Sequence, residues 1–284
     1  MGDFFFILLQ RIVPQHLISR LIGKIACSKY KIIKNTFIFF FLKNYDIKMQ
    51  EALEENPYHY KSFNAFFTRL LKPEVREFIQ DKKVIICPVD GKISQFGAIS
   101  SERIIQAKDR SFNLVDFLGG DEDLEKEFKN GDFFTAYLSP KDYHRVHMPF
   151  SGILRCMSYI PGDLFSVNPS TVSKVNNLFA RNERLVCIFD TNDGPIAITL
   201  VGAMIVAGIK VNWENADFKK NRKIQKWVYP KNGKGSVFLE KGKEFGKFFL
   251  GSTVILCFPN KKINWDKGLN LNTNVRLGQI IATY

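Results

Sequence analysis

Long apolar runs are missing from this 284-residue sequence, and its cysteines form no recognisable motif. No stretch approaches the roughly 20 consecutive apolar residues that a membrane-spanning helix needs. The cysteines are five in number, which is odd, and they include no C-x-x-C pair. Because several lie within apolar, strand-like runs, we expect reduced, buried thiols in a cytosolic compartment. They are Cys27, Cys87, Cys156, Cys187 and Cys257.

Acidic residues are scarce beside basic ones, with 28 Asp and Glu against 41 Lys and Arg and a formal net charge of +13. An excess of this size suits an anionic partner such as nucleic acid or acidic lipid. Neither an aromatic ribonucleoprotein motif nor zinc-finger spacing is present, so nucleic acid is not an expected partner. A biased base composition of the source genome would explain the same excess, so the charge alone does not identify a partner.

The first 50 residues combine basic side chains with apolar ones. Residues 4–9 and 37–42 are strongly apolar. The region contains eight Lys and Arg residues, and its only acidic residues are Asp3 and Asp46. Basic amphipathic helices with aromatic anchors lie in the membrane interface, so we expect peripheral attachment to an anionic surface at the cytoplasmic face of the cell membrane. Between the two runs, large apolar residues recur at helical spacing: Leu17, Ile18, Leu21, Ile22 and Ile25.

Two other interpretations apply to the same region. A signal peptide would need a basic segment before the first apolar run and a small-residue cleavage site after it, and Pro14 breaks the run without either. A pair of helices packed on the core would produce the same apolar spacing, and the spacing does not separate this arrangement from a membrane-facing one.

A serine behind a glycine is the first candidate for chemistry. Gly251 and Ser252 follow a segment rich in glycine and charge, and an apolar, strand-like run at residues 254–258 comes after them. The Ser252 hydroxyl is placed to attack the unhindered carbonyl of Gly251. Glycine and serine also form ordinary turns, so the motif alone leaves both interpretations open.

Two of the four histidines, His144 and His147, fall in one short segment, and Asp90 ends a separate apolar run. Aspartate, histidine and serine together activate a hydroxyl nucleophile, because the base takes the proton and the carboxylate orients the base. Taken singly, Asp90 could be a turn residue, and the histidines could be buried strand residues or metal ligands. A metal needs a third and usually a fourth ligand; the other two histidines, His16 and His59, lie in the N-terminal part, and no cysteine stands beside the pair, so no metal is expected.

Six short segments give the chain a resemblance to the bacterial phosphatidylserine decarboxylases in their proenzyme form. They include Pro88-Val89-Asp90-Gly91, the segment with both histidines, and the segment that ends in Leu250-Gly251-Ser252-Thr253. All six occur in the order typical of the family and span most of residues 60–284. Their ranges are 66–73, 88–91, 137–149, 161–169, 177–184 and 244–253.

The resemblance implies that the chain consumes Ser252 to make its own cofactor. The Ser252 hydroxyl would attack the Gly251 carbonyl, and an N-to-O acyl shift would give an ester. Elimination across the Ser252 Cα–Cβ bond would release the upstream chain as a carboxylate, and the remaining dehydroalanine would hydrolyse to a covalent pyruvoyl group and ammonia. The products would be a β chain of residues 1–251 and an α chain of residues 252–284.

The resemblance also assigns roles to the other candidates. His147 would be the base for the Ser252 hydroxyl, and Asp90 would hold its imidazole in the productive tautomer. His144 would serve decarboxylation as proton donor or substrate orienter. Residues three apart in a strand point to opposite faces, so both rings could face one pocket only with a turn near Arg145.

The implied reaction converts phosphatidylserine to phosphatidylethanolamine. The pyruvoyl ketone would capture the amine of the serine head group and withdraw electrons as the bond to the carboxylate breaks, the role that pyridoxal phosphate plays elsewhere. Neither an external cofactor nor a metal is required. The expected partners are phosphatidylserine, an anionic membrane surface and the chain's own cleaved α and β chains, and a second copy in a homodimer is compatible with this activity.

The pattern predicts an α+β fold with two parts. Residues 1–75 are expected to form a helical membrane-association module, with Pro14 between two helices. Residues 76–284 are expected to form a β-rich catalytic domain of mostly antiparallel strands, with a hairpin turn at residues 192–194 and an acidic helix near residues 121–129. The clearest predicted strands cover residues 133–139, 153–160, 185–190, 196–201 and 253–258.

The sequence is also compatible with two alternative functions. A serine hydrolase could use Ser252, His147 and Asp90 on an external lipid ester, although the Gly-x-Ser-x-Gly elbow of many hydrolases is absent. A non-enzymatic basic module that binds membranes would explain the charge, but it would explain neither the serine nor the paired histidines. The mass of the purified chain separates the first alternative from self-cleavage.

Overall fold

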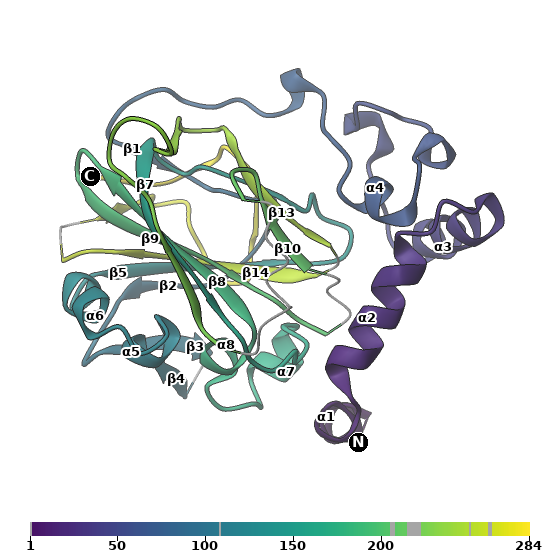
Figure 1. Cartoon of the computed structure of the whole chain (residues 1–284), viewed down its shortest axis with the longest axis horizontal. Coiled ribbons are helices and arrows are strands. Elements are labelled where there is room, and N and C mark those ends of the chain that lie inside the picture. Colours follow the sequence, from purple (N-terminus) through teal and green to yellow (C-terminus); the bar gives the residue numbers. More distant parts are fainter. Residues whose placement is uncertain (1, 108, 205–207, 215–222, 250, 261–262) are drawn as a thin grey trace.

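A computed structural model describes residues 2–107, 109–204, 208–214, 223–249, 251–260 and 263–284. It has an arm of three helices beside a β-rich body (Figure 1). The arm consists of α1 (Gly2–Ile12), α2 (Gln15–Ala26) and α3 (Lys31–Asn44). Pro14 lies between the first two helices, as the sequence predicts. None of the helices described is both long enough and apolar enough to cross a bilayer.

A small aromatic cluster is one of the contacts between the arm and the rest of the chain. The short helix α4 (Phe63–Phe67) begins at Ser62, whose side chain accepts a hydrogen bond from the Ala65 amide and so caps the first turn. Three 3-10 turns surround α4: η1 (Met49–Glu51), η2 (Pro57–His59) and η3 (Pro73–Val75). The buried residues of this cluster are Ala26, Ile38, Phe63, Phe66 and Phe67.

A nine-stranded sheet forms the centre of the body. Neighbouring strands follow the order β11-β7-β8-β9-β14-β5-β2-β16, and β12 also pairs with β7. The pairs in this sheet are antiparallel, as expected from the alternating pattern. The strands are β2 (Gly91–Ala98), β5 (Asp132–Leu138), β7 (Gly152–Ile160), β8 (Arg184–Thr191), β9 (Gly194–Val201), β11 (Gln225–Val228), β12 (Phe238–Leu239), β14 (Ser252–Phe258) and β16 (Asn274–Val275).

Smaller elements cover the two faces of this sheet. One three-stranded sheet joins β10 (Gly208–Val211), β13 (Glu244–Phe249) and β6 (Arg145–His147), and another joins β1 (Val84–Ile86), β17 (Ile280–Thr283) and β15 (Asn264–Trp265). Four short helices and a hairpin complete the body. They are α5 (Leu114–Phe117), α6 (Glu122–Phe128), α7 (Pro169–Val172), α8 (Leu178–Arg181), β3 (Arg103–Ala107) and β4 (Arg110–Asn113).

The core has two halves, one on each face of the large sheet. Alternate residues of a strand point to opposite faces, so Val254 and Leu256 of β14 lie in one cluster, and Ile255 and Cys257 lie in the other. All seven residues of β14 are buried. The first cluster also takes residues from β6, β13 and β17 and the second from α5, α6 and α8, so β14 is a central strand covered on both sides.

The α+β fold expected from the sequence is confirmed, as are the five predicted strands within a residue or two at their ends. The hairpin turn after Thr191 and the acidic helix α6 also form as expected. All five cysteines are free, but Cys27 is exposed, so the expectation of buried thiols is wrong at this position. Basic residues recur between Lys219 and Lys226; residues 219–222 lie outside the described part, and Lys226 on the edge strand β11 pairs with Asp121.

Candidate active site

Ser252 stands at the first position of β14, directly after Gly251. Gly251 has a φ of +50°, in the left-handed region that favours glycine, and a Cβ added there would meet no atom within 4 Å. The carbonyl that Ser252 would attack therefore belongs to a residue with free space around its Cα atom. Leu250, which precedes it in the motif, lies outside the described residues.

The Ser252 hydroxyl is buried and has no hydrogen-bond partner among the described residues. Buried polar groups are nearly always paired, because an unpaired one costs about 1–3 kcal/mol. Along β14, Ser252 shares a face with Val254 and Leu256, which pack in the same cluster as Val146 of β6. This parity directs the serine toward the face of the large sheet that carries the histidine strand.

His147 lies at the end of β6, and both of its ring nitrogens are engaged. Nδ1 is 2.7 Å from the Gly242 carbonyl oxygen, which can only accept, so Nδ1 carries the proton and Nε2 is the basic nitrogen. The Tyr143 hydroxyl lies 3.2 Å from Nε2 and donates to it in this tautomer. Phe78 stacks on the ring with a centroid distance of 5.8 Å. Gly242 has a φ of +80°, and a Cβ there would lie 2.7 Å from Phe78.

His144 immediately precedes β6 and is completely buried. Its Nδ1 donates to the Asp142 carbonyl oxygen at 2.8 Å, which leaves Nε2 as the basic nitrogen, and this atom has no partner among the described residues. The Phe67 ring of α4 lies against the imidazole with a centroid distance of 4.1 Å. The two histidines therefore contact different aromatic rings, and His144 has the basic nitrogen that is not engaged.

Burial keeps both imidazoles neutral. It lowers the pKa of His144 to about 3, against the opposing effect of the hydrogen bond to Asp142. Burial also lowers the pKa of His147. The hydrogen bond to Gly242, the charge of Glu244 and, more weakly, the charge of Asp90 oppose this shift, because each raises the pKa. A neutral imidazole at pH 7 can accept a proton, as a base must.

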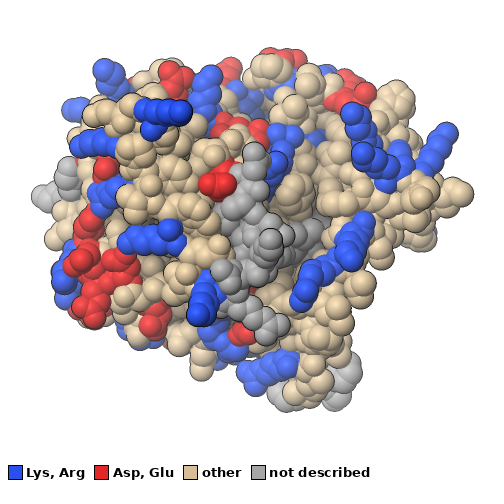
Figure 2. Space-filling model, viewed as in Figure 1, with Lys and Arg blue, Asp and Glu red and all other residues tan. Residues whose placement is uncertain are grey.

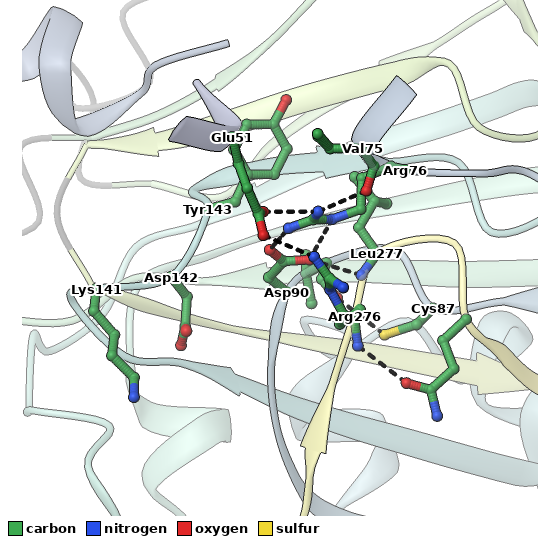
Figure 3. A network of polar contacts seen from close by, with 12 residues as sticks. Glu51, Val75, Arg76, Cys87, Asp90, Lys141, Asp142, Tyr143, Arg276 and Leu277 are labelled. Atoms are coloured by element: carbon green, nitrogen blue, oxygen red, sulfur yellow. Dashed lines mark hydrogen bonds and ion pairs between the residues drawn. The ribbon is translucent and has the colours of Figure 1, made fainter. Parts of the chain in front are cut away.

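Asp90 precedes β2 and does not orient His147 in this structure. Its carboxylate accepts hydrogen bonds from the Arg76 guanidinium and from the Leu277 amide at 2.8 Å (Figure 3). The Gly242 carbonyl stands where the resemblance implied the carboxylate, because it is this oxygen that holds the His147 Nδ1 proton. Among the described residues, no hydrogen bond joins His147 to Asp90 or to Ser252.

A cavity of about 260 Å³ opens beside Asp90, and Ser252, His144 and His147 do not line it. Its walls include Asp90, Tyr143 and Asp142, together with the buried Arg69. The Nε and Nη1 atoms of Arg69 have no hydrogen-bond partner among the described residues. Within the described part of the chain, no group of three or more His, Cys, Asp or Glu side chains is placed to hold a metal ion.

Comparison with known proteins identifies the family. The family model for phosphatidylserine decarboxylase matches residues 63–283, and a second model, described as PSD, matches residues 5–46. The chain belongs to the phosphatidylserine decarboxylase family. This is a family of carboxy-lyases, so the chain is grouped with enzymes and not with binding modules.

Relatives of this family match the chain along nearly all of its length. A phosphatidylserine decarboxylase proenzyme of Saccharophagus degradans is 48% identical over 282 residues, which are 99% of this chain and 98% of the relative. Proteins with the same name from Vibrio cholerae and Pseudomonas putida are 49% and 47% identical over 275 and 277 residues. These comparisons confirm the resemblance that the six segments carry.

Several residues of the site were not singled out by the sequence. Tyr143 and Gly242 hold His147, Phe67 covers His144, and Arg76 holds Asp90. Tyr143 and Phe67 lie inside two of the six family segments, so their position was a usable signal. Arg76 and Gly242 lie outside those segments, and nothing in their local sequence indicates which distant group each would contact.

Proposed function

We propose that this chain decarboxylates phosphatidylserine to phosphatidylethanolamine with a pyruvoyl group that it makes from Ser252. The observation that carries the proposal is the buried, unpaired Ser252 hydroxyl directly after a left-handed Gly251. A hydroxyl without a partner is free to approach the preceding carbonyl, and that carbonyl has no side chain beside it. The family of the chain supports the same reaction.

Self-cleavage uses groups that the chain supplies. The Ser252 hydroxyl attacks the Gly251 carbonyl, its proton passes to His147 Nε2, and the peptide nitrogen leaves as an amine when the ester forms. Loss of the Ser252 Cα proton then expels the Gly251 carboxylate, which frees residues 252–284 as a separate chain. For this step the Tyr143 hydroxyl must give up Nε2 to the serine. Catalytic hydrogen bonds often tighten only in the reacting complex.

The pyruvoyl group fits the place that Ser252 occupies, because the hydroxyl is the unsatisfied polar atom of a closed, mostly apolar site. When formed, it supplies an electron sink for the head-group amine. We assign proton transfer during decarboxylation to His144, whose unprotonated Nε2 has no other partner and can take a proton from the head-group ammonium and return it after carbon dioxide leaves. Asp90 is assigned to self-cleavage, as a partner of His147 once the ring leaves Gly242.

We also propose that the helical arm binds an anionic membrane surface from the cytoplasmic side. Helix α2 supports this proposal, because its buried positions are Ser19, Gly23 and Ala26, while Leu17 and Leu21 are more than half exposed. Small residues thus face the protein and large apolar ones face outward, the reverse of a helix packed on a core. The space-filling view shows Lys and Arg side chains along the same arm (Figure 2).

Mass spectrometry of the purified protein tests self-cleavage. We expect fragments of about 29 and about 4 kDa in place of the 32.7 kDa chain, and borohydride should trap a keto terminus on the small one. The variant Ser252→Ala should remain one inactive chain, because it has no hydroxyl to attack the carbonyl. Normal cleavage of this variant would refute the proposed nucleophile. An intact wild-type chain that slowly hydrolyses esters would favour a serine hydrolase instead.

The same assay, combined with a measurement of decarboxylation, distinguishes the roles of the two histidines. His147→Ala should leave the chain intact, because the base for the hydroxyl is lost. His144→Ala should cleave but decarboxylate at least about 100-fold more slowly per keto terminus, since general acid–base groups contribute roughly 10²- to 10⁴-fold. Equal losses of cleavage and decarboxylation in His144→Ala would show that the division of roles is wrong.

A further inference from the structure

Asp90 is held by a guanidinium from a different part of the chain. Arg76 Nε lies 3.1 Å from Asp90 Oδ1, and Arg76 Nη2 bonds Oδ2, so the contact is bidentate. Figure 3 shows the two side chains facing each other across this contact. A forked pair of this kind fixes the plane of the carboxylate as well as its position, which a single hydrogen bond does not.

Arg76 is in turn braced on its other side. Its Nη1 donates to Glu51 Oε2 at 2.9 Å and to the Val75 carbonyl at 2.8 Å, and its side chain is only 7% exposed. The other oxygen of Glu51 accepts from Arg276 Nη2 at 2.9 Å. Every nitrogen of the Arg76 guanidinium is therefore engaged, and the side chain cannot rotate without breaking several bonds.

The carboxylate of Asp90 still has room for one more donor. Oδ1 already accepts from Arg76 Nε and from the Leu277 amide, whereas Oδ2 accepts only from Arg76. A carboxylate oxygen has two lone pairs, so Oδ2 keeps one that no described residue uses. Asp90 can thus keep its Arg76 contact and at the same time accept a hydrogen bond from His147 Nδ1.

The network also joins both sides of the proposed cleavage point. Arg276 and Leu277 belong to the segment after Ser252, while Glu51, Arg76 and Asp90 precede it. Because β14 and this network both tie residues 252–284 to the rest, the position of Asp90 depends on both chains. A salt bridge in a fully exposed position would contribute little to such an arrangement, but Arg76 and Asp90 are mostly buried.

We propose that Arg76, braced by Glu51, is a positioning residue that holds Asp90 in the orientation required for self-cleavage. This inference rests on the proposed function, in which Asp90 assists His147. Arg76 touches neither Ser252 nor His147 in the described contacts, so it acts through Asp90 and not on the reacting atoms. Its effect is confined to self-cleavage, because Asp90 has no assigned part in decarboxylation.

The test follows the cleavage of freshly synthesised chain by gel for wild type, Arg76→Ala, Arg76→Lys and Glu51→Gln. Misplacement of a reacting group by about 1 Å costs on the order of 100-fold, so we expect Arg76→Ala to cleave about 10- to 100-fold more slowly. Added guanidinium ion should restore part of the rate, and Arg76→Lys should be intermediate because lysine keeps the charge but not the fork. Glu51→Gln should slow cleavage severalfold.

A second readout separates positioning from general damage to the fold. The Arg76→Ala chains that do cleave should decarboxylate with a wild-type rate per keto terminus. Arg155 is the matched control, because it also bonds two carboxylates, Asp190 and Glu127, without contacting Asp90. Arg155→Ala should cleave at the wild-type rate, and guanidinium should not change it.

The outcomes distinguish this inference from the proposed function. If wild type cleaves and Arg76→Ala cleaves equally fast, the inference is overturned and self-cleavage at Ser252 stands. If wild type yields no keto terminus, the proposed function itself fails. If Arg76→Ala does not fold, the Glu51→Gln variant tests the inference instead. An unchanged cleavage rate in Glu51→Gln would show that the contact between Glu51 and Arg76 does not support self-cleavage, and the inference would be overturned.

Discussion

Two candidate site residues have a buried polar atom without a hydrogen-bond partner. Ser252 Oγ and His144 Nε2 are both buried and unpaired within the described structure, whereas both ring nitrogens of His147 and both carboxylate oxygens of Asp90 have partners. Other buried hydroxyls, such as that of Thr253, also have no partner, so this property alone does not mark a functional group. It leaves Ser252 Oγ and His144 Nε2 free to meet a reacting group without first breaking a hydrogen bond.

The lowered pKa of His144 predicts how stability depends on pH. An unfolded chain binds a proton at this residue below about pH 6.5, while the folded chain does not until about pH 3. Because the unfolded state then holds more protons, the free energy of unfolding falls as pH decreases from about 6.5, by at most about 1.4 kcal/mol per pH unit. His144→Gln, in a Ser252→Ala background, should flatten this dependence in urea titrations between pH 7 and 5. Parallel dependences in the two proteins would contradict the burial of a neutral imidazole.

Strand β14 explains how a cleaved chain can stay together. It pairs with β5 on one side and β9 on the other, and β16 and β17 fix the rest of residues 252–284 to β2 and β1. Cutting the backbone before Ser252 removes a covalent link but none of these ladders. The small chain should therefore stay with the large one in native buffer and separate only on unfolding.

Substitutions in this segment test its contribution to the core. Leu256 of β14 is fully buried, and Leu256→Ala should lower the free energy of unfolding by about 2–5 kcal/mol, measured as a shift of the urea midpoint. Leu271 lies in the same segment but is 46% exposed, so Leu271→Ala should change stability by no more than about 0.5 kcal/mol. Similar losses in both variants would mean that β14 does not form the centre of the sheet.

The distribution of apolar surface over the molecule is uneven. Most of the large apolar side chains that are exposed lie in the first 45 residues, where α1, α2 and α3 also carry many of the basic ones. The body buries its apolar residues on both faces of the large sheet. A surface of this kind on one arm is typical of a protein that works at a membrane interface.

Vesicle binding tests this arrangement. A triple variant with asparagine at Leu17, Leu21 and Ile25 should bind vesicles of phosphatidylcholine and phosphatidylglycerol at least about 10-fold more weakly in a sedimentation assay, because each side chain loses apolar contact with the lipid. Self-cleavage of this variant should be unchanged. Ile105→Asn, a substitution at an exposed position of β3, is the control and should bind normally. Unchanged binding by the triple variant would exclude α2 as the contact surface.

Local patterns predicted five buried strands of the large sheet, β5, β7, β8, β9 and β14, but not its other strands. Pro14 separated α1 from α2, and the glycine after Asp193 gave the hairpin. The site residues Ser252, His144, His147 and Asp90 were found through residue type and family resemblance. Each of these signals lies within a few neighbouring positions, where sequence spacing and spatial spacing agree.

The order of the strands and the partners of the site residues were decided only when the chain folded. Asp90 is held by Arg76, and His147 is held by Gly242, which is 95 residues away along the chain. Such pairs depend on which strands lie side by side and in which register, and no local pattern encodes that choice. The candidate residues for self-cleavage could thus be named in advance, whereas their hydrogen bonds follow from the packing of distant segments around β14.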